Sequence, residues 1–138
     1  MYQKVWLFAA AVMMVVGCSG PPKITDDTIQ KMLYPELIDI LDNPGKHPPI
    51  LVDVRPAKYF NEGHIPGAIN IEFVDLIPEN PALAGKGPVI VYSGTWSDYL
   101  SASAAKKLMN RGMDPDRVFD FRGGMDYWIK SDGNISTR

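Results

Sequence analysis

Cysteine and histidine, which most often serve as nucleophile, general base or metal ligand, are scarce in this sequence. The 138 residues include one cysteine, Cys18, and two histidines, His47 and His64. A single cysteine excludes an internal disulfide and a thiolate metal cluster, and we expect neither a metal site nor a cofactor. Ser93 directly follows an apolar strand pattern, at the position where parallel sheets bind their ligands. The chemistry of the chain therefore depends on Cys18 and Ser93.

Cys18 ends a segment that is typical of an export signal. Lys4 precedes an unbroken apolar run over residues 5–16, which is shorter than the ~20 residues that a membrane span needs. Residues 15–18 (Val-Val-Gly-Cys) resemble the lipobox of bacterial lipoproteins, whose cysteine carries a diacylglyceryl thioether and begins the mature chain. We expect a signal peptide over 1–17 and a lipidated tether over 18–23. A free Cys18 thiol after ordinary secretion is the alternative.

The lipobox resemblance also implies a location. A lipidated chain would be anchored in the bacterial cell envelope and face the periplasm, and Ser19 after the cysteine favours the outer membrane over the inner one. Loss of residues 1–17 removes Lys4 and changes the formal net charge from −2 to −3. No basic excess is left to neutralise phosphates, so we expect no nucleic-acid partner.

Helical and strand patterns alternate through the rest of the chain. We predict helices over 25–33, 36–41, 56–62, 100–111 and 125–130, and strands over 50–54, 68–71, 88–92 and 118–121. The strand patterns are apolar and largely β-branched, as in buried parallel strands. The sequence therefore predicts an α/β three-layer domain with a central, mainly parallel sheet over 24–131, followed by a C-terminal tail over 132–138.

Several segments resemble, in order, the signature of the rhodanese-like family. They are 51–55, 59–71 with its GHIPGA turn, 89–92, the alanine-rich helix 101–112, and 121–128 (FRGGMDYW). The similarity runs from about Ile24 to Lys130. It implies the rhodanese-like fold. The family's sulfurtransferases hold sulfur as a persulfide on a cysteine that follows the strand matching 89–92, inside a loop of converging backbone N–H donors.

This sequence departs from the family pattern at both ends of that loop. Ser93 stands at the cysteine position and Leu100 at the position of an arginine, and the loop 93–100 is longer than usual. A serine hydroxyl is a far weaker nucleophile than a thiolate and cannot carry sulfane sulfur reversibly. Asp98 adds negative charge where the family binds anions. We therefore expect a degenerate active loop without a catalytic residue.

A serine hydrolase is an alternative for Ser93. The sequence around Ser93 does not form a Gly-x-Ser-x-Gly elbow. A general base would have to be His47 or His64. His64 lies in the GHIPGA turn, where a structural hydrogen bond is expected, and His47 lies in a proline-flanked loop exposed to solvent. The residues therefore disfavour hydrolysis.

The remaining candidates support the loop or contact a partner. The resemblance implies that Asp53, Arg55 and His64 brace the loop by hydrogen bonds and ion pairing. The loop residues expected to contact a ligand or partner are Gly94, Thr95, Trp96, Ser97, Asp98 and Tyr99. The two aromatic residues among them either fold back as loop core or stand out as contact anchors.

Two functions of different class follow from these residues. The first is an envelope-anchored rhodanese-like lipoprotein that lacks sulfurtransferase activity and binds an envelope protein or a ligand through the 93–100 loop. The second is a thiosulfate or persulfide sulfurtransferase, or a redox accessory enzyme, that works by another route. Ser93 and Leu100 favour the first.

Overall fold

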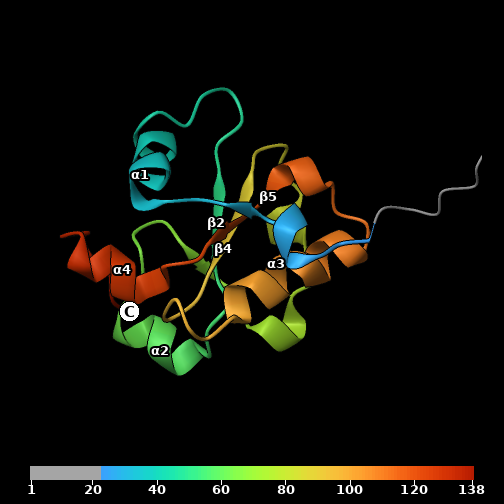
Figure 1. Cartoon of the computed structure of the whole chain (residues 1–138). Helices are drawn as coiled ribbons and strands as arrows, with labels where there is room; N and C mark the ends of the chain where they lie inside the picture. The colour runs from blue at the N-terminus through green and yellow to red at the C-terminus, as the bar shows by residue number, and fades with distance from the viewer. Residues whose placement is uncertain (1–22) are drawn as a thin grey trace, which may run out of the picture.

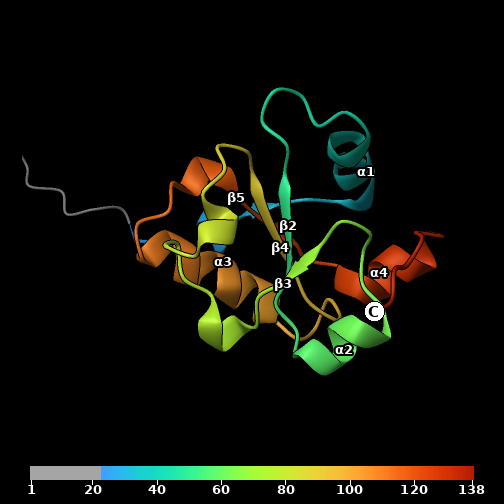
Figure 2. The ribbon, with the colours of Figure 1, turned by 180° about the vertical axis from the view of Figure 1, so that it is seen from behind.

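A computed structural model describes residues 23–138, which fold around a five-stranded sheet. The strands are β1 (Gln30–Lys31), β2 (Ile50–Asp53), β3 (Ile69–Asn70), β4 (Val89–Tyr92) and β5 (Val118–Phe121). Their order is β1-β5-β4-β2-β3, and all four ladders are parallel. Figure 2 shows β3 beside β2. The predicted α/β domain with a mainly parallel sheet is confirmed.

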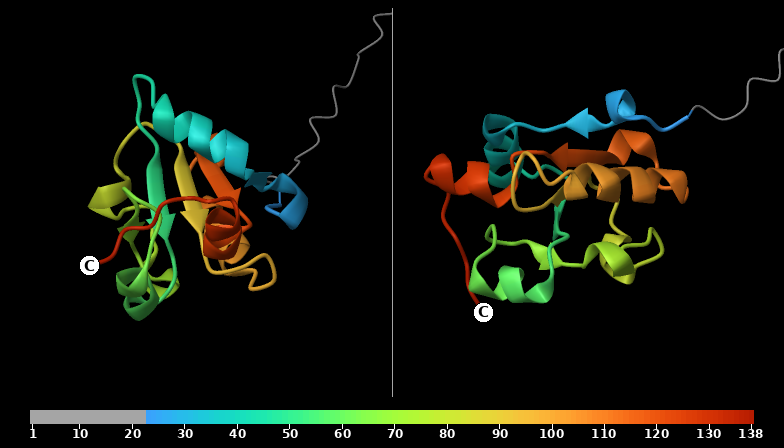
Figure 3. Two further views of the ribbon diagram at one scale, coloured as in Figure 1. Left: turned by 90° about the vertical axis from the view of Figure 1, so that its left-hand side faces the viewer. Right: turned by 60° about the horizontal axis from the view of Figure 1, so that its bottom comes forward.

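The helices form two layers on either side of this sheet. The α-helices are α1 (Tyr34–Asp42), α2 (Ala57–Glu62), α3 (Leu100–Asn110) and α4 (Gly124–Lys130), and the short 3-10 helices are η1 (Asp26–Thr28), η2 (Phe73–Asp75), η3 (Pro81–Leu83) and η4 (Pro115–Arg117). α1, α2 and α4 lie on one face, and α3 lies on the other (Figures 1 and 3). Apart from the N-terminal segment, the predicted elements end within one or two residues of the observed ones.

Alternating side chains of the central strands fill a core on each face. Val89 and Val91 of β4 pack with Leu108 of α3. Ile90 and Tyr92 face the opposite way and pack with the other helices, including Leu37 of α1. Since the central strands are buried on both faces, polar side chains that follow them gather at the carboxyl edge of the sheet.

The helix predicted over 25–33 is wrong. Residues 26–28 form the 3-10 helix η1, and Gln30–Lys31 form strand β1, which pairs with β5. Ile29 belongs to the core on the α3 face and Met32 to the core on the opposite face. A spacing of three residues fits one face of a helix, but here it places the two side chains on opposite sides of a strand. Residues 30–31 form a strand rather than a helix because they pair with the edge of β5 that β4 leaves free.

The membrane-anchor prediction is not addressed by the fold. The signal peptide, Cys18 and the tether up to residue 22 lie outside the described residues. Within residues 23–138, no helix is both long enough and apolar enough to cross a membrane.

Candidate active loop

The candidate site is the loop that joins β4 to α3 at the carboxyl end of the sheet, beside α4 (Figure 1). Ser93 follows β4 and is almost fully buried. Two backbone N–H groups of α4 hold the start of the loop: Met125 N donates to the Ser93 carbonyl at 2.9 Å, and Asp126 N donates to the Gly94 carbonyl at 2.9 Å. Helix α4 therefore fixes the backbone from which the Ser93 side chain projects.

This close approach of α4 requires glycine at position 124. Gly124 has φ +57°, a conformation that side chains rarely adopt, and a Cβ there would overlap the carbonyl oxygen of Ser93. The glycine thus places α4 directly against the loop.

The side chain of Asp98 turns back into the loop and accepts four hydrogen bonds. Its Oδ2 accepts from the Ser93 hydroxyl at 2.7 Å. The same oxygen accepts from the backbone N–H groups of Gly94 at 2.9 Å and Thr95 at 3.1 Å. Its Oδ1 accepts from the Leu100 N–H at 3.1 Å. The converging donors of the loop therefore already bind an anion, and the chain itself supplies it.

These hydrogen bonds set the charge of Asp98. Partial burial opposes ionisation, but the hydrogen bonds from Ser93 and from the backbone of Thr95, Leu100 and Gly94 outweigh it and lower the pKa of the carboxyl group below its usual value. Asp98 is therefore ionised at neutral pH and is a poor base toward the Ser93 hydroxyl.

The two histidines make their contacts elsewhere. His64 Nδ1 lies 2.8 Å from the Phe60 carbonyl oxygen, and its ring stacks on Phe60 at 3.8 Å between centroids. The backbone of His64 exchanges two 2.9 Å hydrogen bonds with Ser136. His47 is exposed in the loop before β2. His64 thus joins α2 to the C-terminal tail, and its hydrogen bonds go to these two segments rather than to the 93–100 loop.

Asp53 and Arg55 form a fixed pair next to the loop. Arg55 Nη2 donates to Asp53 Oδ2 at 2.6 Å and to the Gly63 carbonyl at 2.7 Å, and Arg55 Nε donates to Asp53 Oδ1 at 3.0 Å. Asn70 Nδ2 donates to the backbone carbonyls of both Asp53 and Arg55. Because Asp53 is completely buried, its charge requires such pairing. The pair positions the Arg55 guanidinium along one side of the loop.

Two hollows flank the loop. One, the Ser93 pocket, has a volume of about 300 Å³ and is lined by Arg55, Pro56, Tyr59, Ser93, Gly94, Asp98 and Leu100. The other, the Arg122 pocket, has a volume of about 380 Å³ and is lined by Asp26, Ile29, Lys31, Trp96, Tyr99, Ala102 and Arg122. The loop residues singled out from the sequence therefore separate a hollow near α2 from a hollow near β1.

The two aromatic residues of the loop remain accessible. Trp96 is 47% exposed and contacts Tyr127 at 5.9 Å between ring centroids. Tyr99 is 62% exposed, and the Arg122 guanidinium lies 4.4 Å from the centre of its ring. Tyr99 also adopts φ +51°, a conformation that costs a non-glycine residue about 1 kcal/mol. The loop thus holds Tyr99 at the surface in a strained conformation.

Arg122, Asp120 and Ser101 were missed as site residues in the sequence analysis. Arg122 Nη1 pairs with Asp120 at 3.3 Å. Burial raises the pKa of Asp120, and the positive charge of Arg122 offsets part of that rise. Within the described residues, Ser101 Oγ and Asp120 Oδ1 are buried without a hydrogen bond. Arg122 directly follows β5, as Ser93 follows β4, so its position after a strand was the available signal.

Comparison with protein families and solved structures gives a consistent result. The family model described as "Rhodanese-like domain" matches residues 34–131. The BH2092 protein from Bacillus halodurans is 26% identical, with a TM-score of 0.70 over 80% of this chain and 79% of that one. A thiosulfate sulfurtransferase from Pseudomonas aeruginosa has a TM-score of 0.63 at 19% identity, over 81% of this chain and 21% of that one, and shows the fold alone.

Curated relatives are larger proteins. The "HTH-type transcriptional regulator Rv0324" of Mycobacterium tuberculosis is 33% identical over 78 residues, which are 56% of this chain and 33% of that protein. The "Adenylyltransferase and sulfurtransferase UBA4" of Candida albicans is 34% identical over 97 residues, covering 64% of this chain and 21% of that protein. This chain therefore spans a third or less of the length of these relatives.

Proposed function

The chain belongs to the rhodanese-like domain family, which relates it to sulfurtransferases, and we propose that it lacks sulfurtransferase activity and binds an envelope protein through the 93–100 loop. The observation that carries this proposal is the Ser93–Asp98 pair, in which the chain's own carboxylate accepts the hydrogen bonds of the loop.

Two properties of this pair argue against sulfur transfer. Ser93 offers a hydroxyl that already donates to Asp98, and an oxygen nucleophile cannot form the persulfide that sulfurtransfer requires. An anionic sulfur donor would also have to compete with the Asp98 carboxylate for the same N–H groups and approach its negative charge. The two obstacles lie on different residues, so a change at Ser93 alone would leave the Asp98 carboxylate in place.

The exposed side of the loop supports binding of a protein. Trp96 and Tyr99 present large aromatic surfaces of the kind that concentrate binding energy at interfaces. Arg122 lies against Tyr99 and Lys31 lines the same pocket, whose one acidic lining residue, Asp26, is paired with Lys106, so positive charge adjoins the aromatic surface. A partner with an apolar anchor beside an acidic side chain would match both features.

A membrane anchor at Cys18 is the second element of the proposal, and its basis is the lipobox-like sequence at 15–18. The lipid would hold the domain at the periplasmic side of the envelope, in the outer membrane rather than the inner one. Palmitate labelling of the chain in a bacterial host tests this, and we expect Cys18→Ala to abolish the label and release the chain from the membrane fraction. Label retained in that variant would refute the anchor.

Photo-crosslinking in intact envelopes tests the binding surface. A photoreactive amino acid replaces Trp96 or Tyr99 in the full chain, and replaces Val74, which is 73% exposed but lies in η2, as the matched control. We expect positions 96 and 99 to crosslink to the same protein and position 74 not to do so. Equal crosslinking from position 74, or different proteins from 96 and 99, would contradict a binding surface at the loop.

A further inference from the structure

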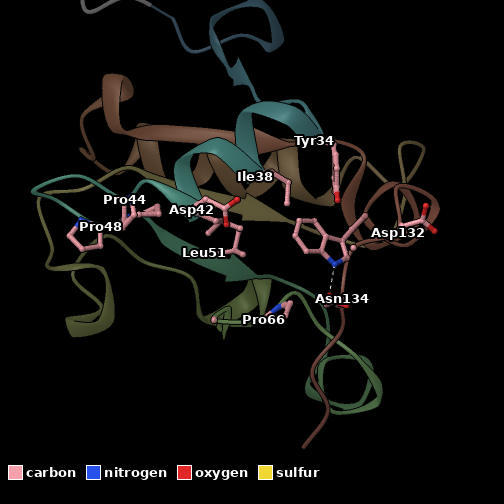
Figure 4. A pocket seen from close by; sticks show the side chains of 14 residues that line it. Tyr34, Ile38, Asp42, Pro44, Pro48, Leu51, Pro66, Asp132 and Asn134 are labelled. Atoms are coloured by element: carbon pink, nitrogen blue, oxygen red, sulfur yellow. Dashed lines mark hydrogen bonds between the residues drawn. The ribbon is translucent and has the colours of Figure 1, made fainter.

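A third hollow lies away from the loop, between α1, the start of β2 and the segment after α4 (Figure 4). Its volume is about 510 Å³, which suits a whole small molecule. The lining side chains include Tyr34, Ile38, Asp42, Leu51, Pro66 and Trp128. None of the residues that line this hollow lines the Ser93 pocket or the Arg122 pocket. It is therefore a separate candidate site.

The wall of this hollow has few hydrogen-bond donors. Four of its residues, Pro44, Pro48, Pro49 and Pro66, have no backbone N–H group. The indole N–H of Trp128 already donates to the Asn134 carbonyl at 2.7 Å, as the dashed line in Figure 4 marks. Apart from the Tyr34 hydroxyl and the Asn134 side-chain amide, the wall therefore presents mainly apolar surface and acceptor oxygens, and it suits a ligand that brings its own donors.

Acidic side chains lie at both ends of the hollow, and one of them, Asp42, also adjoins the carboxyl end of a helix. Asp42 is the last residue of α1, where the unpaired carbonyls of the helix also carry partial negative charge. The last turn of α1 contains no basic residue, and no ion pair within residues 23–138 involves Asp42. Figure 4 shows Asp42 beside Leu51, with Asp132 at the opposite end of the hollow. A cation at Asp42 would offset charge that the described residues leave uncompensated.

Aromatic rings lie on the other side of the hollow. The ring of Tyr34 lies 5.3 Å from that of Trp128 at a tilt of 58°, and both residues line the hollow. Aromatic faces attract organic cations and also pack against apolar groups. The hollow thus combines an acidic residue at each end with an apolar and aromatic body.

We propose that this hollow binds a small organic cation, in which an ammonium or guanidinium group is attached to an aromatic or branched aliphatic body. The cationic group donates hydrogen bonds to Asp42 and to the free carbonyls at the end of α1. The body packs against Leu51, Ile38 and Trp128. This binding does not depend on the function proposed for the 93–100 loop.

An NMR titration of the full chain with three matched probes tests the proposal. The probes are 2-phenylethylamine, the uncharged 2-phenylethanol and the anionic 3-phenylpropanoate, and the signals followed are the Trp128 indole N–H and the backbone N–H groups of α1. We expect the amine to shift these signals and to bind on the order of tenfold more tightly than the propanoate at neutral pH. Equal affinity of the amine and the propanoate would overturn the proposal.

Two charge-removing variants locate the interaction. Asp42→Asn should weaken amine binding severalfold and leave the affinity for 2-phenylethanol unchanged. Asp39→Asn is the matched control, because Asp39 lies on the same helix but lines a different hollow. We expect it to leave amine binding unchanged. An equal loss in both variants would show attraction to the surface of the chain in general and would overturn the site.

Discussion

Asp98 limits the chemistry of Ser93, because its carboxylate accepts hydrogen bonds from the Ser93 hydroxyl and from the backbone N–H groups of Gly94 and Thr95. A loop of converging donors normally favours an incoming anion. Here the anion is a side chain held by four hydrogen bonds, so the loop is an internally satisfied structure rather than an open site. Substitutions at these two residues should therefore change the same property.

A cysteine introduced at position 93 tests this coupling. In a Cys18→Ala background, we expect the thiol of Ser93→Cys to have an ordinary or raised pKa, because the Asp98 carboxylate opposes a thiolate beside it. Adding Asp98→Asn should lower the thiol pKa by about one unit or more. The pH dependence of the iodoacetamide alkylation rate measures both values.

The matched control for this experiment is Asp126→Asn, which removes an exposed carboxylate from α4 close to the loop backbone. It should leave the alkylation profile of Ser93→Cys unchanged. Identical profiles with and without Asp98→Asn would show that Asp98 does not govern the reactivity of position 93.

Asp98 and Asp120 should affect stability in opposite directions as the pH changes. The pKa of Asp98 is lowered in the folded chain, so its stabilisation is present above its unfolded pKa of about 4 and is lost as the pH falls through the folded value. The pKa of Asp120 is raised, so its stabilising effect is present below about pH 4 and is lost as the pH rises through the folded value.

Urea unfolding between about pH 3 and pH 7 measures the effect. We expect the free energy of unfolding of Asp98→Asn to fall below that of the wild type at neutral pH, with the difference shrinking in acid. For Asp120→Asn, the free energy relative to the wild type should instead rise with pH. Parallel pH profiles for the two variants would contradict these assignments.

At the scale of elements, the contact between α4 and the loop holds the site together. Gly124→Ala tests this contact, and Gly112→Ala is the matched control. Both glycines have positive φ, but only Gly124 faces a backbone atom that a Cβ would overlap. We expect Gly112→Ala to lower the free energy of unfolding by about 1 kcal/mol and Gly124→Ala to lower it by about 2 kcal/mol more. Equal losses would show that the approach of α4 is not fixed by Gly124.

The elements also show what the sequence could predict. Strands such as 88–92 were predictable because a short β-branched apolar run has one stable location, the middle of a parallel sheet. The segment 25–33 was not, because its structure depends on pairing with β5, about ninety residues away. In the loop, the types and positions of Ser93 and Asp98 were readable. The hydrogen bonds from Ser93 and the loop N–H groups to the Asp98 carboxylate could not be predicted, because they depend on the path of the loop backbone.

At the scale of the whole molecule, the two proposed binding sites lie in different parts of the fold. The loop lies at the carboxyl end of the sheet, whereas the hollow at Asp42 lies between α1, the start of β2 and the segment after α4. In two curated relatives, the region that matches this chain makes up a third or less of the protein. The proposed lipid anchor would hold the rhodanese-like domain of this chain at the envelope, where the proposed binding partner would also lie.

An assay of thiocyanate formation from thiosulfate and cyanide measures whether this rhodanese-like chain transfers sulfur. We predict that the purified full chain produces thiocyanate no faster than a protein-free blank, and that Ser93→Ala is indistinguishable from the wild type. Turnover above the blank that disappears in Ser93→Ala would show that the chain is a sulfurtransferase that depends on Ser93.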